Sequence, residues 1–124
     1  MGRKKRTVAL VLGSGGARGL AHIGIIEELL NRGYEITSVS GTSMGALVGG
    51  IYAAGKLEDF KHWIEGVDKF KMFQLLDFTF RFDGLVKGSR IINTLKELVP
   101  DVPIEDLPIP FSAIATDVHA EKEI

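Results

Sequence analysis

Hydrophobic patterning in the first forty residues restricts the fold more than any other feature of the sequence. Residues 7–12 read Thr-Val-Ala-Leu-Val-Leu, an unbroken apolar run typical of an interior parallel strand covered on both faces. From Leu20 to Leu30 apolar residues recur at intervals of three and four, which indicates an amphipathic helix that stops at Gly33. Residues 34–40 return to an extended pattern. A strand, a helix and a strand of these lengths predict a right-handed parallel crossover.

The rest of the chain continues this alternation. Residues 44–54 are apolar and rich in Gly and Ala, which predicts a helix packed closely inside the fold. Residues 57–67 and 89–99 have the pattern of two further helices, and residues 111–118 are a second candidate for a buried strand. All four prolines lie in residues 100–110, where they predict an extended surface connection.

Together these elements predict a three-layer α/β/α sandwich with a mainly parallel central sheet, whose carboxyl ends carry the active groups. Only about three strands are evident, and a sheet this small keeps an unpaired edge. The phenylalanine-rich residues 69–82 show no clear pattern, and core packing is their default role, with an acyl-chain wall as the alternative. We therefore expect residues 7–124 to be the N-terminal part of a larger domain, preceded by a basic arm at residues 1–6.

The composition is that of an ordinary globular protein and excludes several classes. The net charge is −1, but four basic residues gather at positions 3–6. We interpret this arm as a solvated terminus and expect no nucleic-acid partner. The absence of cysteine excludes disulfides and thiol catalysis and fits a cytoplasmic protein. No apolar run approaches the roughly 18 residues of a membrane span, so any membrane contact is expected to be peripheral.

A Gly-Thr-Ser-Met-Gly pentapeptide at residues 41–45 separates the second predicted strand from the apolar helix. A serine that projects its hydroxyl from a sharp strand-to-helix turn is held in a strained backbone conformation. Glycines two residues before and after it keep neighbouring side chains from colliding there. Ser43, flanked by Gly41 and Gly45, is therefore a candidate nucleophile on a nucleophile elbow.

A glycine loop, Gly-Ser-Gly-Gly-Ala-Arg-Gly at residues 13–19, joins the first predicted strand to the first helix. Its N–H groups converge with the positive end of that helix, which favours an anion. The spacing of Gly13, Gly15 and Gly19 is one residue too long for a dinucleotide fingerprint, and the Gly-Lys-Ser/Thr of a P-loop is absent. An oxyanion hole remains, since neighbouring parallel strands would place this loop beside Ser43.

The two motifs together resemble a known family. Residues 12–24, followed after a strand by Gly-Thr-Ser-Met-Gly-Ala at residues 41–46, closely resemble the bacterial patatin-like phospholipases. Residues 84–88 and 114–117 also look like landmarks of that family, so the resemblance covers nearly the whole chain. Two motifs in the right order and separation are far more specific than either alone.

The resemblance implies roles for the residues of both motifs. Ser43 is the nucleophile, and N–H groups around the two central glycines of the loop form the oxyanion hole. The residues expected to form the oxyanion hole and bind substrate are Gly15, Gly16, Ala17, Arg18 and Met44. Among these, Arg18 shapes the loop or meets an anionic substrate. Ser14 departs from the family's usual glycine triplet, but it can still present its backbone N–H.

The catalytic base is missing from these residues. By resemblance the family uses a Ser-Asp dyad whose aspartate comes from an Asp-Gly-Gly/Ala motif far downstream, and no such motif occurs here. The Asp-Gly pair at residues 83–84 is better explained as a turn, and Asp117 at the end of a predicted strand is an alternative base. A Ser-His-Asp triad would need His22, His62 or His119, of which His22 is nearest the glycine loop. A structural hydrogen bond is the competing role for His22.

We therefore expect a serine lipid acyl hydrolase of the phospholipase A, lysophospholipase or esterase type, acting on a lipid or another ester. It needs no cofactor, and no cluster of His, Asp or Glu suggests a metal site. The chain alone should be catalytically incomplete because it lacks the base. The alternatives are a non-catalytic module that binds phosphate or acyl groups, and an esterase or acyltransferase of the Ser-His-Asp type.

Overall fold

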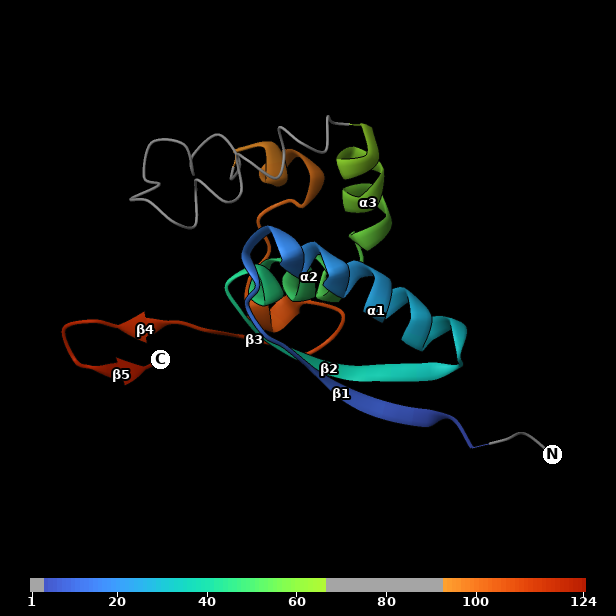
Figure 1. Cartoon of the computed structure of the whole chain (residues 1–124), viewed down its shortest axis with the longest axis horizontal. Coiled ribbons are helices and arrows are strands. Elements are labelled where there is room, and N and C mark those ends of the chain that lie inside the picture. Colours follow the sequence, from blue (N-terminus) through green and yellow to red (C-terminus); the bar gives the residue numbers. More distant parts are fainter. Residues whose placement is uncertain (1–3, 67–92) are drawn as a thin grey trace.

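The computed structural model describes residues 4–66 and 93–124, and a three-stranded parallel sheet lies at its centre (Figure 1). The strands β1 (Arg6–Leu12), β2 (Tyr34–Thr42) and β3 (Phe111–Ile114) are in the order β1-β2-β3. The predicted α/β class with a mainly parallel sheet is confirmed. The prediction of an interior first strand is wrong for the described residues, because β1 pairs only with β2 and is mostly exposed or half-buried.

Helices follow the first two strands, as the patterning predicts. A short 3-10 turn, η1 (Gly16–Leu20), leads into α1 (Ala21–Asn31), which returns the chain to β2. After β2 come α2 (Met44–Ala53) and α3 (Leu57–Gly66). α1 and α2 lie on the same face of the sheet, with α2 in contact with all three strands (Figure 1). Within the described part of the chain, no helix covers the opposite face.

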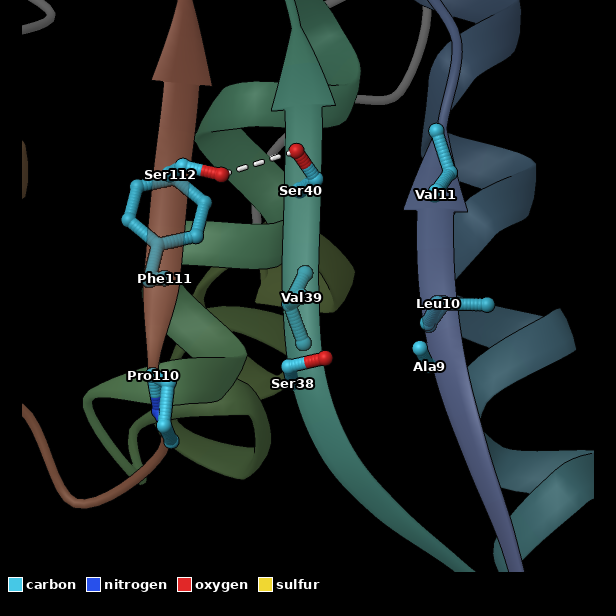
Figure 2. A pocket seen from close by; sticks show the side chains of 9 residues that line it. All are labelled: Ala9, Leu10, Val11, Ser38, Val39, Ser40, Pro110, Phe111 and Ser112. Atoms are coloured by element: carbon cyan, nitrogen blue, oxygen red, sulfur yellow. Dashed lines mark hydrogen bonds between the residues drawn. The ribbon is translucent and has the colours of Figure 1, made fainter.

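Figure 2 shows this uncovered face of the sheet. A shallow hollow of 290 Å³ runs along it and is lined by all three strands. Ser40 of β2 and Ser112 of β3 lie side by side there, with their hydroxyl oxygens 2.9 Å apart in a hydrogen bond. Val11 of β1 remains 76% exposed. The hollow thus follows the strands and is distinct from the two loops at their carboxyl ends.

The core lies between the sheet and the helices. Ile26 of α1 and Met44 and Val48 of α2 are completely buried. Gly49 of α2 is pressed against β2, since a β-carbon at this position would come within 2.8 Å of the Cγ1 atom of Val39. The small residues of α2 therefore let its backbone approach the sheet closely, as predicted for a helix inside the fold.

A β-bulge gives β2 one residue more than its partner strand. Val8 of β1 pairs with Ile36, whereas the next residue of β1 pairs with Ser38, so Thr37 is unmatched. The Thr37 hydroxyl donates to the Val8 carbonyl over 3.2 Å. Beyond such a bulge the alternation of faces is offset by one residue. Ile36 and Val39 are accordingly both buried in the core although they are three positions apart.

An ion pair links two of the helices on the side away from the sheet. The Lys61 Nζ of α3 lies 2.9 Å from Oε1 of Glu27 on α1. The hydrogen bond and the charge of the Glu27 carboxylate raise the pKa of the Lys61 ammonium. Glu27 is half-buried at this contact, although it is a charged residue on an amphipathic helix.

The connection from α3 to the last strand of the sheet is only partly described. Residues 93–98 are helical, inside the predicted helix at residues 89–99. The proline-bearing connection contains a 3-10 turn, η2 (Ile104–Asp106), and is otherwise irregular. The phenylalanine-rich stretch, the Asp-Gly pair at residues 83–84 and the family landmark at residues 84–88 lie outside the described residues.

The single buried strand predicted at residues 111–118 is wrong. Only β3 joins the sheet, and its residues are largely exposed. Because β2 ends at Thr42, which pairs with Ile114, no neighbouring strand continues beside the following residues. They form instead a hairpin of β4 (Thr116–Asp117) and β5 (Lys122–Glu123), which projects away from the sheet (Figure 1).

The chain enters the sheet at the end opposite to the hairpin. β1 begins at Arg6, one residue before the predicted strand, and the Arg6 guanidinium lies 6.0 Å from the centre of the Tyr34 ring. Lys4 and Lys5, which directly precede it in the chain, are thus next to the amino end of β1. No helix in the described ranges has the length and apolar character needed to cross a bilayer.

Candidate active site

Two loops leave the sheet at the adjacent carboxyl ends of β1 and β2. In the strand register, Leu12 pairs with Gly41. The glycine loop at residues 13–19 therefore starts beside the elbow at residues 41–45. The expectation that two parallel strands would bring these loops together is confirmed.

Ser43 turns the chain from β2 into α2 with a backbone conformation that few L residues adopt. Its φ is 53° and its ψ is −125°. A non-glycine residue in such a sparsely populated region is strained by roughly 1 to 3 kcal/mol. The residue is exposed, and its side chain makes no capping hydrogen bond to α2. The Ser43 hydroxyl is consequently free to meet a reactant, which is what a nucleophile elbow requires.

Gly41 and Gly45 allow the elbow to fold this tightly. A β-carbon on Gly41 would collide with the backbone of Gly45. A β-carbon on Gly45 would collide with the carbonyl oxygens of Leu12 and Gly13, where β1 passes into the glycine loop. The elbow and the glycine loop thus touch through their backbones, and any larger residue at Gly45 must push them apart.

A second contact joins the two motifs at the far end of the glycine loop. A β-carbon on Gly19 would collide with the side chain of Met44, and it would lie 3.1 Å from the Ser14 carbonyl oxygen. Met44 itself is completely buried. The residue directly after the candidate nucleophile therefore anchors the loop through its side chain. The sequence singled out Met44 by resemblance, but nothing in its pattern predicted this packing.

Gly15 and Gly16 give the loop its shape. Their φ angles of 114° and 54° belong to the left-handed region that glycine adopts readily. The Gly15 carbonyl accepts a hydrogen bond from the Arg18 N–H over 3.1 Å, which closes the first turn of η1. The N–H groups of Gly16 and Ala17, at the start of this turn, have no helical carbonyl to bond. Such N–H groups stabilise negative charge, so the loop can serve an oxyanion.

His22, in the first turn of α1, is tied to the glycine loop. Its Nε2 atom lies 2.8 Å from the Gly13 carbonyl oxygen. Because a carbonyl only accepts, Nε2 is the donor of this hydrogen bond. Nδ1 is buried and has no hydrogen-bond partner among the described residues. A triad histidine needs one nitrogen for the serine and a carboxylate on the other, so the contacts of His22 match the structural role.

The other candidate bases are engaged elsewhere or exposed. The Asp117 Oδ1 atom accepts hydrogen bonds from the N–H groups of His119 and Ala120, both over 3.0 Å, and so closes the turn of the projecting hairpin (Figure 1). His62 is exposed on α3. Across residues 4–66 and 93–124, no carboxylate or imidazole is hydrogen-bonded to Ser43. The Asp-Gly pair at residues 83–84 lies outside these ranges.

Arg18 projects from η1 next to the candidate oxyanion donors. It is exposed and has no ion-pair partner within the described part of the chain, unlike Arg32, whose Nε lies 2.7 Å from Oε1 of Glu28. The guanidinium is therefore available to an anionic group that approaches the loop. In the same described ranges, no group of three or more His, Asp or Glu side chains could hold a metal ion.

The sequence is similar to one protein family and to several relatives. The family model described as patatin-like phospholipase matches residues 10–123. NTE family proteins of Mycobacterium tuberculosis and Mycobacterium bovis are each 46% identical over 123 residues, which is 99% of this chain and 34% of theirs. The neuropathy target esterase sws of Drosophila persimilis is 36% identical over 119 residues, which is 92% of this chain and 8% of its own length.

The matched region includes both loops, the end of β1 from residue 10 onward, and all of the strands β2 to β5. The chain spans about one third of the length of the mycobacterial relatives. On the family match and on these identities, the chain belongs to the patatin-like phospholipase family.

Proposed function

We propose that Ser43 is the nucleophile of a serine lipid acyl hydrolase of the phospholipase A, lysophospholipase or esterase type. One observation carries this proposal. Ser43 is exposed and held at φ 53°, while Gly45, two residues further along, packs against the Gly13 carbonyl at the start of the glycine loop. In this proposal the Ser43 hydroxyl reacts beside the N–H groups at the start of η1, which have no helical carbonyl to bond among the described residues. Membership of the patatin-like phospholipase family, and likeness to a protein named as an esterase, support an ester as the bond attacked.

The proposed reaction has two steps. The Ser43 Oγ attacks the ester carbonyl carbon, its proton passes to a base, and the carbonyl oxygen becomes an oxyanion. N–H groups of Gly16, Ala17 and Met44 donate to that oxyanion. The intermediate then expels the alcohol, which takes up the proton, and the acyl group remains on Ser43. Water attacks this ester in the same way, which releases the fatty acid and restores the serine hydroxyl.

The base in this proposal is an aspartate downstream of residue 124. Two observations support it: no described carboxylate or imidazole is hydrogen-bonded to Ser43, and the mycobacterial relatives continue far beyond the matched region. Without a base the Ser43 hydroxyl stays protonated at neutral pH. We therefore expect the 124-residue chain to hydrolyse p-nitrophenyl esters no faster than its Ser43→Ala variant. Enzyme-like turnover by this chain, lost in Ser43→Ala, would place the base within it.

The decisive experiment uses the longer protein that contains this chain and a downstream Asp-Gly-Gly/Ala motif. A fluorophosphonate probe is expected to label Ser43 stoichiometrically, and Ser43→Ala is expected to lower ester turnover at least about 1000-fold. Ser40→Ala is the matched control, because this serine lies on the uncovered face and bonds Ser112. Equal loss in both variants would show that the effect comes from the fold and not from nucleophilic attack.

A non-catalytic binding module is the second candidate, and the unpaired Arg18 beside the loop is the observation that favours it. In that case the loop would hold a phosphate or an acyl carboxylate, and Ser43 would be only a tight-turn residue. A folded sample of the longer protein that resists the fluorophosphonate probe, yet binds inorganic phosphate in an Arg18-dependent manner, would support this candidate over the hydrolase.

A further inference from the structure

We infer that His22 is a positioning residue, whose single hydrogen bond to Gly13 holds the glycine loop against the elbow. The inference rests on the proposed function, since the placement of the loop affects a reaction only if Ser43 is the nucleophile. It assigns the imidazole no proton transfer and no contact with substrate.

The Gly13 carbonyl is the point where three elements meet. Its oxygen accepts the hydrogen bond from Nε2 of His22 over 2.8 Å, and the same oxygen packs against Gly45 so closely that a β-carbon there would collide with it. Gly13 follows directly after β1, His22 belongs to α1, and Gly45 lies in the first turn of α2. A shift of this one peptide would therefore change the spacing between the oxyanion donors and Ser43.

The hydrogen bond also closes the loop on itself. Gly13 and His22 are nine residues apart, and between them lie three further glycines, at positions 15, 16 and 19. Glycine has more backbone freedom to lose than any other residue, so an unfastened loop of this composition would sample many conformations. A bond between its two ends removes much of that freedom before substrate arrives, which is the preorganisation that an oxyanion hole needs.

The two ring nitrogens have unequal roles, and this separates positioning from catalysis. Nε2 makes the bond to Gly13, whereas Nδ1 is buried without a partner in the described part of the chain. Holding the loop therefore needs only a donor nitrogen at the position of Nε2. A glutamine amide can place its NH2 near the position of Nε2, whereas an asparagine amide reaches only as far as Nδ1. These two substitutions retain or remove the bond while both abolish imidazole chemistry.

The first test measures steady-state ester hydrolysis by the longer protein. His22→Asn is expected to lower kcat about 10- to 100-fold with KM changed less than about twofold, because misplaced oxyanion donors matter most in the transition state. His22→Gln is expected to keep kcat within about threefold of wild type. His62→Asn, which removes an exposed imidazole from α3, is the matched control. Unchanged kcat in His22→Asn, or equal losses in both His22 variants, would overturn the inference.

The second test does not depend on activity. Hydrogen–deuterium exchange is followed in a peptide that covers residues 13–20 of the same protein. Faster exchange in His22→Asn, with wild-type exchange in His22→Gln and His62→Asn, is the expected result, and unchanged exchange in His22→Asn would contradict the inference. If the wild-type protein neither hydrolyses esters nor reacts with the fluorophosphonate probe, the proposed function fails. The exchange result then still decides whether His22 fastens the loop.

Discussion

Two strands of the sheet end at the same level and continue in opposite ways. β2 passes into the elbow, where Ser43 is strained and its neighbours are packed against the ends of β1 and η1. β3 passes into a hairpin whose hydrogen bonds are local, with Ala115 and Ile124 exchanging two backbone bonds of 2.9 Å. The difference shows what a strained turn requires: surrounding structure must hold it from several sides, whereas a relaxed hairpin can stand alone.

We call the segments that follow β2 and β3, which are the elbow and the hairpin, the two exits of the sheet. The contacts at these two exits are of different kinds. Around the elbow, Gly45 packs against the Leu12 and Gly13 carbonyls, and Gly19 packs against the Met44 side chain. Neither glycine position therefore has room for a larger residue. In the hairpin, by contrast, the Asp117 side chain caps its own turn and both strands are exposed or half-buried. Substitutions at the first exit should therefore affect the whole domain, and substitutions at the second should remain local.

The largest effect is expected from Gly45→Ala. Its β-carbon would enter the space of the two carbonyl oxygens, which cannot rotate away as a flexible side chain could. We expect the free energy of unfolding in urea to fall by about 3 kcal/mol. Gly24→Ala is the matched control, because its β-carbon would meet no atom within 4 Å on α1, and it should raise that free energy by up to about 1 kcal/mol. Similar free energies of unfolding for the two variants would contradict the claim that the elbow is packed too tightly for a larger residue.

A smaller and local effect is expected from Asp117→Ala. The substitution removes two side-chain hydrogen bonds that close the hairpin turn, each worth about 1 kcal/mol. Hydrogen exchange at residues 116–123 should accelerate, while the free energy of global unfolding should change by less than about 0.5 kcal/mol. Reaction of Ser43 with a fluorophosphonate probe in the longer protein should be unaffected. A loss of labelling would identify Asp117 as the catalytic base and would mean that the elbow and the hairpin belong to one active site.

The smallest effect concerns the ion pair between Glu27 of α1 and Lys61 of α3. The Glu27 carboxylate raises the pKa of Lys61 above its ordinary value of 10.5, so the folded state holds this proton more tightly than the unfolded chain. The pair's contribution is then complete below about pH 10 and declines as pH rises through the folded pKa. Wild type should lose slightly more stability than Lys61→Met in alkaline urea titrations.

Tyr52 also titrates at alkaline pH, so its contribution to the pH dependence of stability must be separated from that of the ion pair. Burial raises the pKa of its phenol, so it also favours the protonated folded state and loses stability in the same direction. Because Tyr52 is present in both proteins, the difference between wild type and Lys61→Met isolates the ion pair. Parallel pH profiles would mean that the ion pair contributes no measurable stability.

Much of the site's framework could be predicted because it depends on local rules. Apolar runs and their periods give β1, α1, β2 and α2 to within two residues, and glycine spacing places both loops at the carboxyl ends of parallel strands. The positive φ of Ser43 follows from the same spacing. These features need only neighbours in sequence and the topology of a parallel crossover.

The parts that were not predicted depend on partners distant in sequence. Residues 111–118 have the apolar character of a buried strand, yet β2 has already turned away by Ile114, and in the described part of the sheet no strand lies beside the residues that follow. The bond from His22 to Gly13 depends on how α1 is rotated, although a histidine at the start of a helix that follows a glycine loop was the available signal. The Met44 contact with Gly19 arises only after β1 and β2 are in register.

Thr37 decides the side of the sheet from which the elbow rises. Every residue of β2 beyond this bulge is offset by one position, which is why Gly41 lies beneath α2 and not on the uncovered face. Deleting one residue between Thr37 and Gly41 while the bulge is kept would invert that side, whereas adding one at the turn around Gly33 would leave it unchanged. Tolerance to a change in chain length therefore depends here on whether the change falls within the paired part of β2 or at the turn before it, and not on how far the two motifs lie apart.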